Sequence, residues 1–380
     1  MLARASRGRP DEFCGPGRPC SSLTARSSIE GGAVARLQGF RSLAVICLAV
    51  GAVAVLASPA VADTATIADE PFSGVSVPTA VWSIGGLNTP CLTAATVSAV
   101  GSIPACPGAP LDSVGDGALR FTDAAFQTGF AILNTPLDTS LGLKIQFDFF
   151  QYNNPIDPGD GMSFFLIDGA VSPTEAGSYG AGMGYASYHP QSLAGLAGGV
   201  VGVAFDSFGA FSDPVIGSGG PGVATPNSVA VRGDEASDYF LLLSHAAAGP
   251  LAVPAATLRD DARRHVVVTI SKLNVMSIAV DYGAGLVTEI AALDLETANG
   301  AGSLPSTLKL GFAGSTEGAH LTTEIQNFQI EALPPDPAPP RPQLAATGVA
   351  GQPWTVGLAG IGLAIAGALM WGSRRRRAAR

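Results

Sequence analysis

Short apolar runs separated by turn residues fill the middle of this chain. Leu143–Phe149 alternates apolar and polar positions, which predicts a strand with one buried and one solvated face. Phe164–Leu166 is apolar at successive positions, as expected for a central strand covered on both sides. Clusters of Gly, Pro, Asn and Asp separate the runs. The other predicted strands are Ala118–Thr122, Met162–Ile167, Gly199–Phe205, Ser228–Arg232, Tyr239–Leu243, His265–Ile270, Val275–Asp281, Leu308–Phe312 and Glu324–Glu331.

Residues 63–332 show no sustained helical periodicity. Many short strands, abundant glycine and no helices predict an all-β fold of two packed sheets, a β-sandwich. Because no internal repeat is visible, we expect residues 63–332 to form a single domain.

The first 62 residues have the pattern of an export signal. The apolar run Leu43–Leu56 follows a basic residue, and the small residues Ala60–Ala62 come next. This order is typical of a secretory signal peptide and predicts cleavage before Asp63. The long upstream part is unusual for such a signal and suggests that translation starts near Val34.

The last 48 residues predict a linker and a membrane anchor. Leu333–Gln343 is rich in proline, so we expect an extended spacer. Thr355–Trp371 is apolar and is followed closely by the basic cluster Arg374–Arg377. This pattern predicts one transmembrane helix with the arginines on the inner side of the membrane.

The pentapeptide Leu344–Gly348 precedes this anchor and reads Leu-Ala-Ala-Thr-Gly. It resembles the Leu-Ala-X-Thr-Gly sorting signal of high-GC Gram-positive bacteria. The resemblance implies that a sortase cuts between Thr347 and Gly348 and joins Thr347 to the peptidoglycan of the cell wall. A plain membrane anchor with a chance pentapeptide is the alternative. The predicted organisation is therefore signal region 1–62, sandwich 63–332, linker 333–343 and sorting region 344–380.

Charge and cysteine content limit the partners and the compartment. Residues 63–347 contain 9 Lys and Arg against 27 Asp and Glu, a net charge of −18. Such a surface cannot follow a phosphate backbone, which excludes nucleic acid as a partner. Cys91 and Cys106 are the two cysteines of this part. A cysteine pair in an exported chain predicts a disulfide, which would stabilise the fold by roughly 3 kcal/mol.

Three motifs in sequence order resemble the L-type lectin family in its bacterial form. They are Gly159–Leu166, Gly199–Phe208 and Leu308–Thr316, the last followed by Glu324–Phe328. The resemblance spans most of the exported chain and implies the concanavalin or legume-lectin jelly roll. It also implies a carbohydrate-binding site built from loops at one end of the sandwich.

The resemblance assigns sugar contacts to three loops. Asp160 matches the aspartate that accepts hydrogen bonds from sugar hydroxyls, a role that suits an acceptor-only carboxylate. In the family the peptide bond before this aspartate is cis. The aromatic ring of Phe208 would stack on the sugar. The remaining implied contacts are the backbone of Gly198 and Gly199 and the loop residues Ser315, Thr316 and Glu317.

The metal loop of this family is incomplete here. The resemblance implies calcium ligands at Asp206, at the Phe208 carbonyl and at Asp213, but Ala210 stands where the family has an asparagine. Three donors fall short of the six to eight oxygens that calcium takes, so we expect calcium to bind weakly or not at all. We expect no manganese, because Ala204 and Gly219 replace the glutamate and histidine of that site.

Several motifs have simpler readings. Asp160-Gly161 alone is typical of a hairpin turn, and Asp206 could cap a turn. Arg232-Gly233-Asp234 spells a tripeptide that some adhesins present to integrins, but it follows a strand where a turn needs glycine. The glycine-rich segment Gly180–Gly184 lacks the strand and helix that a nucleotide loop requires. The four histidines are too scattered to suggest a zinc site or a catalytic triad.

Three functions are compatible with the sequence. The first is a wall-anchored lectin or adhesin that binds polysaccharides or glycoproteins. The second is a structural surface protein with a degenerate lectin site, for which Ala210 is the evidence. The third is a jelly-roll glycoside hydrolase, which needs two facing carboxylates. No predicted strand has these carboxylates at alternate positions, and Asp294-Leu295-Glu296 is the nearest match. The sequence therefore favours a non-enzymatic lectin.

Overall fold

The computed structural model describes residues 65–79, 81–96, 101–108, 110–298 and 304–334. Within these ranges the chain forms mostly strands, with one short α-helix and four 3-10 helices. The strands are β1 (Thr66–Glu70), β2 (Trp82–Gly86), β3 (Cys91–Leu92), β4 (Leu119–Thr122), β5 (Thr128–Leu133), β6 (Leu143–Tyr152), β7 (Gly161–Asp168), β8 (Gly199–Asp206), β9 (Ser228–Arg232), β10 (Leu241–Ala246), β11 (Arg263–Ile270), β12 (Val275–Asp281), β13 (Leu286–Asp294), β14 (Leu308–Ser315) and β15 (Thr322–Ala332). The helices are η1 (Thr139–Leu141), η2 (Gly180–Gly182), η3 (His189–Gln191), η4 (Arg259–Ala262) and α1 (Leu295–Ala298).

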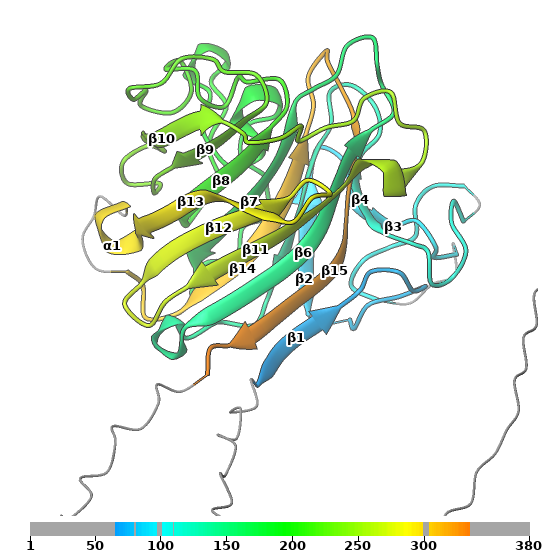
Figure 1. Cartoon of the computed structure of the whole chain (residues 1–380), viewed down its shortest axis with the longest axis horizontal. Coiled ribbons are helices and arrows are strands. Elements are labelled where there is room, and N and C mark those ends of the chain that lie inside the picture. Colours follow the sequence, from blue (N-terminus) through cyan, green and yellow to red (C-terminus); the bar gives the residue numbers. More distant parts are fainter. Residues whose placement is uncertain (1–64, 80, 97–100, 109, 299–303, 335–380) are drawn as a thin grey trace, which may run out of the picture. The chain divides into compact units, whose positions relative to one another are not determined.

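The described strands form two antiparallel sheets that pack face to face (Figure 1). One sheet has the order β13-β12-β11-β6-β15-β4-β3, with β1 paired to β15. The other has the order β10-β9-β8-β7-β14-β5-β2. Every ladder between the named strands is antiparallel, and neighbours in the sheets are often distant in sequence. The predicted all-β sandwich of the jelly-roll type is confirmed.

A core of aromatic and aliphatic side chains fills the space between the sheets. Phe147 of β6 faces Phe164 of β7 and Phe312 of β14, and all three rings are buried. The ring centroids of Phe147 and Phe312 lie 4.8 Å apart in an edge-to-face arrangement, a favourable geometry for aromatic pairs. Burying each such ring contributes on the order of 2–3 kcal/mol.

A second apolar layer covers the outer face of the β7–β8 sheet. Phe165 and Ala204 point away from the main core and pack with Phe211 and Ile216, which belong to the connection between β8 and β9. Tyr185, from the connection between β7 and β8, joins the same layer. These two connections therefore fold over the sheet, which explains why β7 is apolar at successive positions.

The sequence prediction is wrong at one strand boundary and missed several strands. Tyr239 does not begin β10: it has a left-handed backbone with φ of 55°, and its hydroxyl donates to the Leu196 carbonyl. The predicted disulfide between Cys91 and Cys106 is confirmed and ties β3 to the loop that follows it. The strands that the sequence did not predict are β1, β2, β3, β5 and β13.

The predicted signal region 1–62 and sorting region 344–380, with its transmembrane helix, lie outside the described residues, as does most of the linker 333–343. Among the residues that are described, no helix is long and apolar enough to cross a membrane. The first and last strands of the domain, β1 and β15, are paired, and the Ala332 N–H donates to the Ala65 carbonyl. Its two ends therefore lie side by side (Figure 1).

Candidate functional site

Asp160 lies immediately before β7, where the connection from β6 enters the sheet. The peptide bond between Gly159 and Asp160 is cis, as the family resemblance implies. The Asp160 side chain is only 3 % exposed. One carboxylate oxygen, Oδ2, is buried and has no hydrogen-bond partner among the described residues. Buried polar atoms are almost always paired, so an orphaned carboxylate oxygen marks a place where a ligand donor could bind.

The backbone of Asp160 joins the other two predicted loops. Its carbonyl accepts hydrogen bonds from the backbone N–H groups of Ser207, at 3.0 Å, and Phe208, at 3.2 Å. Its own N–H donates to the Ser315 carbonyl at 3.3 Å. A Cβ on Gly159 would lie 3.1 Å from Cδ2 of Phe208, so the glycine allows the ring to approach. The structure thus brings Asp160, Phe208 and Ser315 to one end of the sandwich.

Burial controls the ionisation of the two aspartates at this end. Loss of hydration and, to a smaller extent, the nearby Asp206 raise the pKa of the Asp160 carboxyl to about 7. The backbone N–H of Glu317 donates to the Asp160 carboxyl and lowers its pKa. Burial also raises the pKa of Asp206 to about 7, against three backbone N–H groups that lower it. Ionising either group is therefore costly in the free protein, and donors from a ligand would favour the ionised form of Asp160.

The loop after β14 forms a second side of the site. Ser315 and Thr316 are buried, and Ser315 Oγ has no partner within the described part of the chain. The Thr316 hydroxyl donates to the Ala124 carbonyl at 2.8 Å and so holds the loop. Glu317 is half-buried, and its carbonyl accepts from the Phe126 N–H at 2.9 Å. The backbones of Ser315 and Glu317 bond to Asp160, whereas Thr316 has a supporting role.

The connection between β7 and β8 supplies a third side that the sequence did not predict. Gly180 has φ of 63°, and a Cβ there would lie 3.0 Å from Cβ of Glu317. The Gln191 amide donates to Glu317 Oε1 at 3.4 Å, and the Tyr179 hydroxyl donates to Gln191 at 2.7 Å. The signal for this side in the sequence is the glycine-rich segment Gly180–Gly184. Its glycines allow a close approach to Glu317.

Gly198 and Gly199 do not belong to this site. Gly199 pairs with Ile167, whereas Asp206 pairs with Gly161 beside Asp160. The glycines therefore lie at the opposite end of the β7–β8 ladder, about 20 Å away at 3.3 Å per residue. Gly198 donates its N–H to a Glu235 carboxylate oxygen there. The prediction failed because the connection before β8 is long enough to return along the sheet before the strand begins.

In the loop after β8, the two carboxylates predicted to bind calcium accept hydrogen bonds from backbone N–H groups. The Asp206 carboxylate accepts from the N–H groups of Gly209, at 2.6 Å, and Phe211, at 2.8 Å, one on each oxygen. Asp213 Oδ1 accepts from the Val215 N–H at 3.0 Å. Ala210 contributes no side-chain oxygen. Calcium requires six to eight oxygens that are free to coordinate, so these residues do not fit calcium.

Among the described residues, no group of three or more His, Cys, Asp or Glu side chains is placed to hold a metal ion. The nearest match to paired hydrolase carboxylates is engaged elsewhere: Asp294 accepts from the N–H of Glu296 and from the Thr297 hydroxyl, and so caps α1. His189 and His245 pair with Asp238 and Glu289, respectively. The Ser187 hydroxyl also donates to Asp238, at 2.7 Å.

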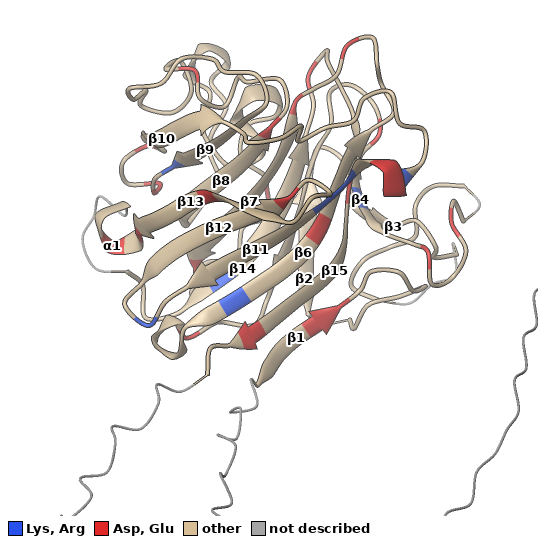
Figure 2. Cartoon of the chain, in the orientation of Figure 1, with Lys and Arg blue, Asp and Glu red and all other residues tan. Residues whose placement is uncertain are grey.

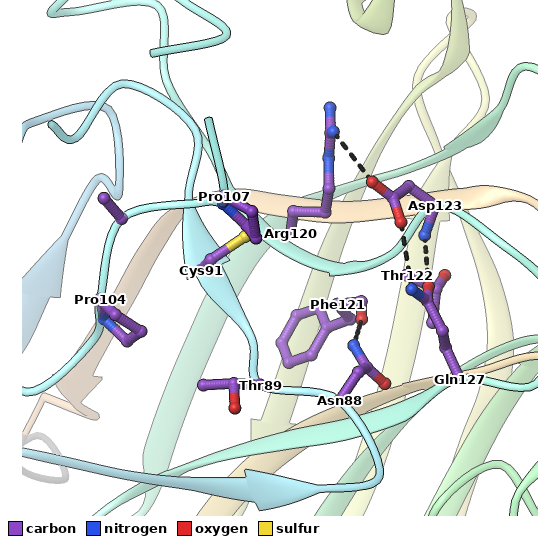
Figure 3. Close-up of a pocket in the computed structure, with 11 residues that line it drawn as sticks. Asn88, Thr89, Cys91, Pro104, Pro107, Arg120, Phe121, Thr122, Asp123 and Gln127 are labelled. Carbon is purple, nitrogen blue, oxygen red and sulfur yellow. Dashed lines mark hydrogen bonds and ion pairs between the residues drawn. The ribbon is translucent and has the colours of Figure 1, made fainter. Parts of the chain in front are cut away.

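A separate cavity of about 320 Å³ lies beside the disulfide (Figure 3). Its polar side chains are mostly bonded to one another: Arg120 pairs with Asp123, and the Gln127 amide donates to Asp123 Oδ1. The Asn88 amide donates to the Phe121 carbonyl. This cavity is therefore a weaker candidate than the Asp160 site.

Comparisons with known proteins give a likeness of fold. No protein-family model and no curated protein matches the chain. Matching solved structures include a peanut lectin with a nine-residue peptide (17% identity, 72% of this chain and 98% of that chain, TM-score 0.47) and a seed lectin of Lotus tetragonolobus (15%, 71% and 100%, TM-score 0.47). Another is the exoplasmic domain of VIP36 in a form bound to Ca2+ and Man3GlcNAc (11%, 59% and 83%, TM-score 0.39). At these identities the likeness concerns the fold alone, and nothing about ligands follows from it.

Proposed function

We propose that this protein is an exported, cell-wall-anchored lectin that binds carbohydrate at the Asp160 site. The observation that carries the proposal is the buried Asp160 oxygen without a partner, placed beside the Phe208 ring, which is 48 % exposed. A carboxylate acceptor recognises sugar hydroxyls, and an exposed aromatic face accepts the apolar side of a sugar ring. This combination of groups supports a neutral polyol ligand.

The surface around the site agrees with such a ligand. Ile156 and Phe126 are exposed apolar side chains on loops next to Asp160 and Glu317. Tyr179, Gln191 and Glu317 form a chain of hydrogen-bonding groups along another side. Lys and Arg are sparse over the described sandwich (Figure 2). Apolar faces alternating with polar groups suit sugars better than phosphate-bearing ligands.

The position of the site supports presentation at a cell surface. Ser315 lies at the site end of β14, and β15 then runs from Thr322 to Ala332 before the linker begins. An eleven-residue strand spans about 35 Å, so the linker leaves the sandwich far from the site. A chain anchored by a sortase at Thr347 would thus direct the Asp160 loops away from the wall. The signal peptide and the Leu344–Gly348 motif support export and anchoring.

A glycan array tests the binding activity, with the full chain applied once in calcium and once in EDTA. The proposal predicts binding to a defined set of glycans that does not depend on calcium. A structural surface protein with a degenerate site would bind none of them. Release of reducing sugar from a bound polysaccharide would instead identify a glycoside hydrolase.

A further inference from the structure

The side chain of Arg232 is a fully buried cation beneath the β8–β9 connection, residues 207–227. Arg232 is the last residue of β9, and its side chain points to the outer face of the sheet, away from the main core. Its guanidinium lies over the Phe211 ring at 5.3 Å from the centroid. Among the described residues no carboxylate lies within ion-pair distance of Arg232, although Asp213 and Asp238 lie near enough to favour its charged form.

Backbone carbonyls surround this guanidinium. Nε donates to the Phe211 carbonyl at 2.8 Å, and one terminal nitrogen donates to the Asp213 carbonyl at 2.8 Å. The other terminal nitrogen donates to the carbonyls of Ile216, at 2.8 Å, Gly219, at 3.2 Å, and Tyr239, at 2.9 Å. Four of these carbonyls belong to the 207–227 connection. Carbonyl oxygens gathered around a positive charge are the environment that a protein offers to a bound cation.

Burial lowers the pKa of Arg232 to about 10, so the group remains charged at neutral pH. The same connection is fixed at its start by Asp206, whose carboxylate accepts from the N–H groups of Gly209 and Phe211. Its first residues, Ser207 and Phe208, donate to the Asp160 carbonyl. The guanidinium is thus linked through the connection to the backbone of the binding site.

We propose that Arg232 is the cation that organises the 207–227 connection, in the role that a bound metal ion would otherwise have, and that the Asp160 site is therefore assembled without metal. The donor set opposes calcium here, because the carboxylates of Asp206 and Asp213 accept hydrogen bonds from backbone N–H groups and Ala210 supplies no side-chain oxygen. A divalent ion would also be repelled by the guanidinium. The inference concerns how the site is built and does not depend on which ligand it binds.

Thermal melting of the full chain in calcium chloride and in EDTA is the first test. The wild-type melting temperature should be the same in both. Arg232→Lys keeps the charge but replaces the planar fork of five N–H groups by a compact ammonium. We expect it to melt about 5–10 °C lower and to be cut by chymotrypsin after Phe211, which is buried in wild type.

Two further variants separate this role from general stabilisation. Arg264→Lys is the matched control, because Arg264 is also buried and bonded to the carbonyls of Pro250 and Arg263, but on the other sheet. It should melt lower without exposing Phe211 to chymotrypsin. Arg232→Ala should recover protection and melting temperature in methylguanidinium and not in methylammonium at equal ionic strength.

A wild-type melting temperature that rises by several degrees in calcium would overturn the proposal. Unchanged protection of the connection in Arg232→Lys would overturn it equally. If Arg232→Ala does not fold, the melting of wild type in calcium and the proteolysis of Arg232→Lys still decide the question. All of these experiments measure thermal stability or proteolysis. Their results therefore do not depend on whether the glycan array detects binding.

Discussion

The Asp160 carboxyl is buried, but only one of its two oxygens is hydrogen-bonded. Burial raises its pKa from 3.8 to about 7, and one of its oxygens lacks a partner among the described residues. Between these two values the folded state binds more protons than the unfolded state. The free energy of unfolding therefore falls as the pH rises from about 4 to about 7. The Asp160 carboxyl therefore costs stability at neutral pH.

Asp160→Asn should remove part of this pH dependence. The amide still accepts from the Glu317 N–H but cannot ionise, so the variant should be more stable than wild type at pH 8 by about 1–3 kcal/mol. The two proteins should be nearly equal at pH 4. Urea unfolding across this range measures the difference. If the plots of unfolding free energy against pH are parallel for the two proteins, Asp160 has the same pKa in the folded and unfolded states, which would contradict the prediction.

We expect Phe208 to contribute to binding, because this aromatic residue is 48 % exposed. Phe208→Ala should weaken binding of the best array glycan by about 1 kcal/mol, the size of one aromatic contact, with little change in stability. Phe208→Trp should retain binding. Phe240→Ala is the matched control, since Phe240 is similarly exposed at 42 % but lies beside Gly233 at another turn. An equal loss in both alanine variants would argue against a specific contact at Phe208.

Among the structural elements, central strands were the easiest to predict. β7 and β8 are apolar on both faces because the sheet is covered on both sides, and their bounds agree with the prediction within about one residue. β13 was missed because it is mostly exposed and its sequence does not alternate between apolar and polar residues. It is an edge strand, and such a strand does not need that alternation. β2 was missed because its sequence, Trp-Ser-Ile-Gly-Gly, ends in two glycines.

The binding site was predictable only where its residues stand at strand ends. Asp160 and Phe208 flank paired strands, so their convergence follows from the register of β7 with β8. Arg232 could not be predicted, because its five carbonyl partners lie 7 to 21 residues away along an irregular connection. No local pattern in the sequence encodes that arrangement. The misplaced Gly198 shows the same limit for long connections.

The short strand β3 is held by the Cys91–Cys106 disulfide, which closes a loop of 15 residues. Replacing both cysteines by alanine should lower the free energy of unfolding by about 3 kcal/mol in the chain-entropy model. Affinity for the glycan should not change, because neither cysteine touches the Asp160 site. Urea unfolding and a binding titration of the same variant measure both quantities. A loss of affinity would mean that the β3 region supports the site.

For the whole molecule, the account predicts a mature chain that begins near Asp63 and ends at Thr347. Its linker would leave the sandwich at Ala332, at the end remote from the Asp160 loops. Mass spectrometry of wall digests should find a C-terminal peptide that ends at Thr347 and is joined to peptidoglycan. A peptide from wall fractions that contains Arg374–Arg377 would contradict sortase cleavage and favour a membrane anchor.

The central claim is that one buried carboxylate at the loop end of the sandwich binds carbohydrate without metal. Calorimetric titration of the best array glycan in EDTA tests it most directly, with wild type, Asp160→Asn and the control Asp281→Asn, a partly exposed aspartate of β12, side by side. The account predicts that wild type and Asp281→Asn bind equally. Asp160→Asn should bind at least about tenfold more weakly, a difference of about 1.4 kcal/mol, while remaining folded. Equal affinity in Asp160→Asn and wild type would contradict it.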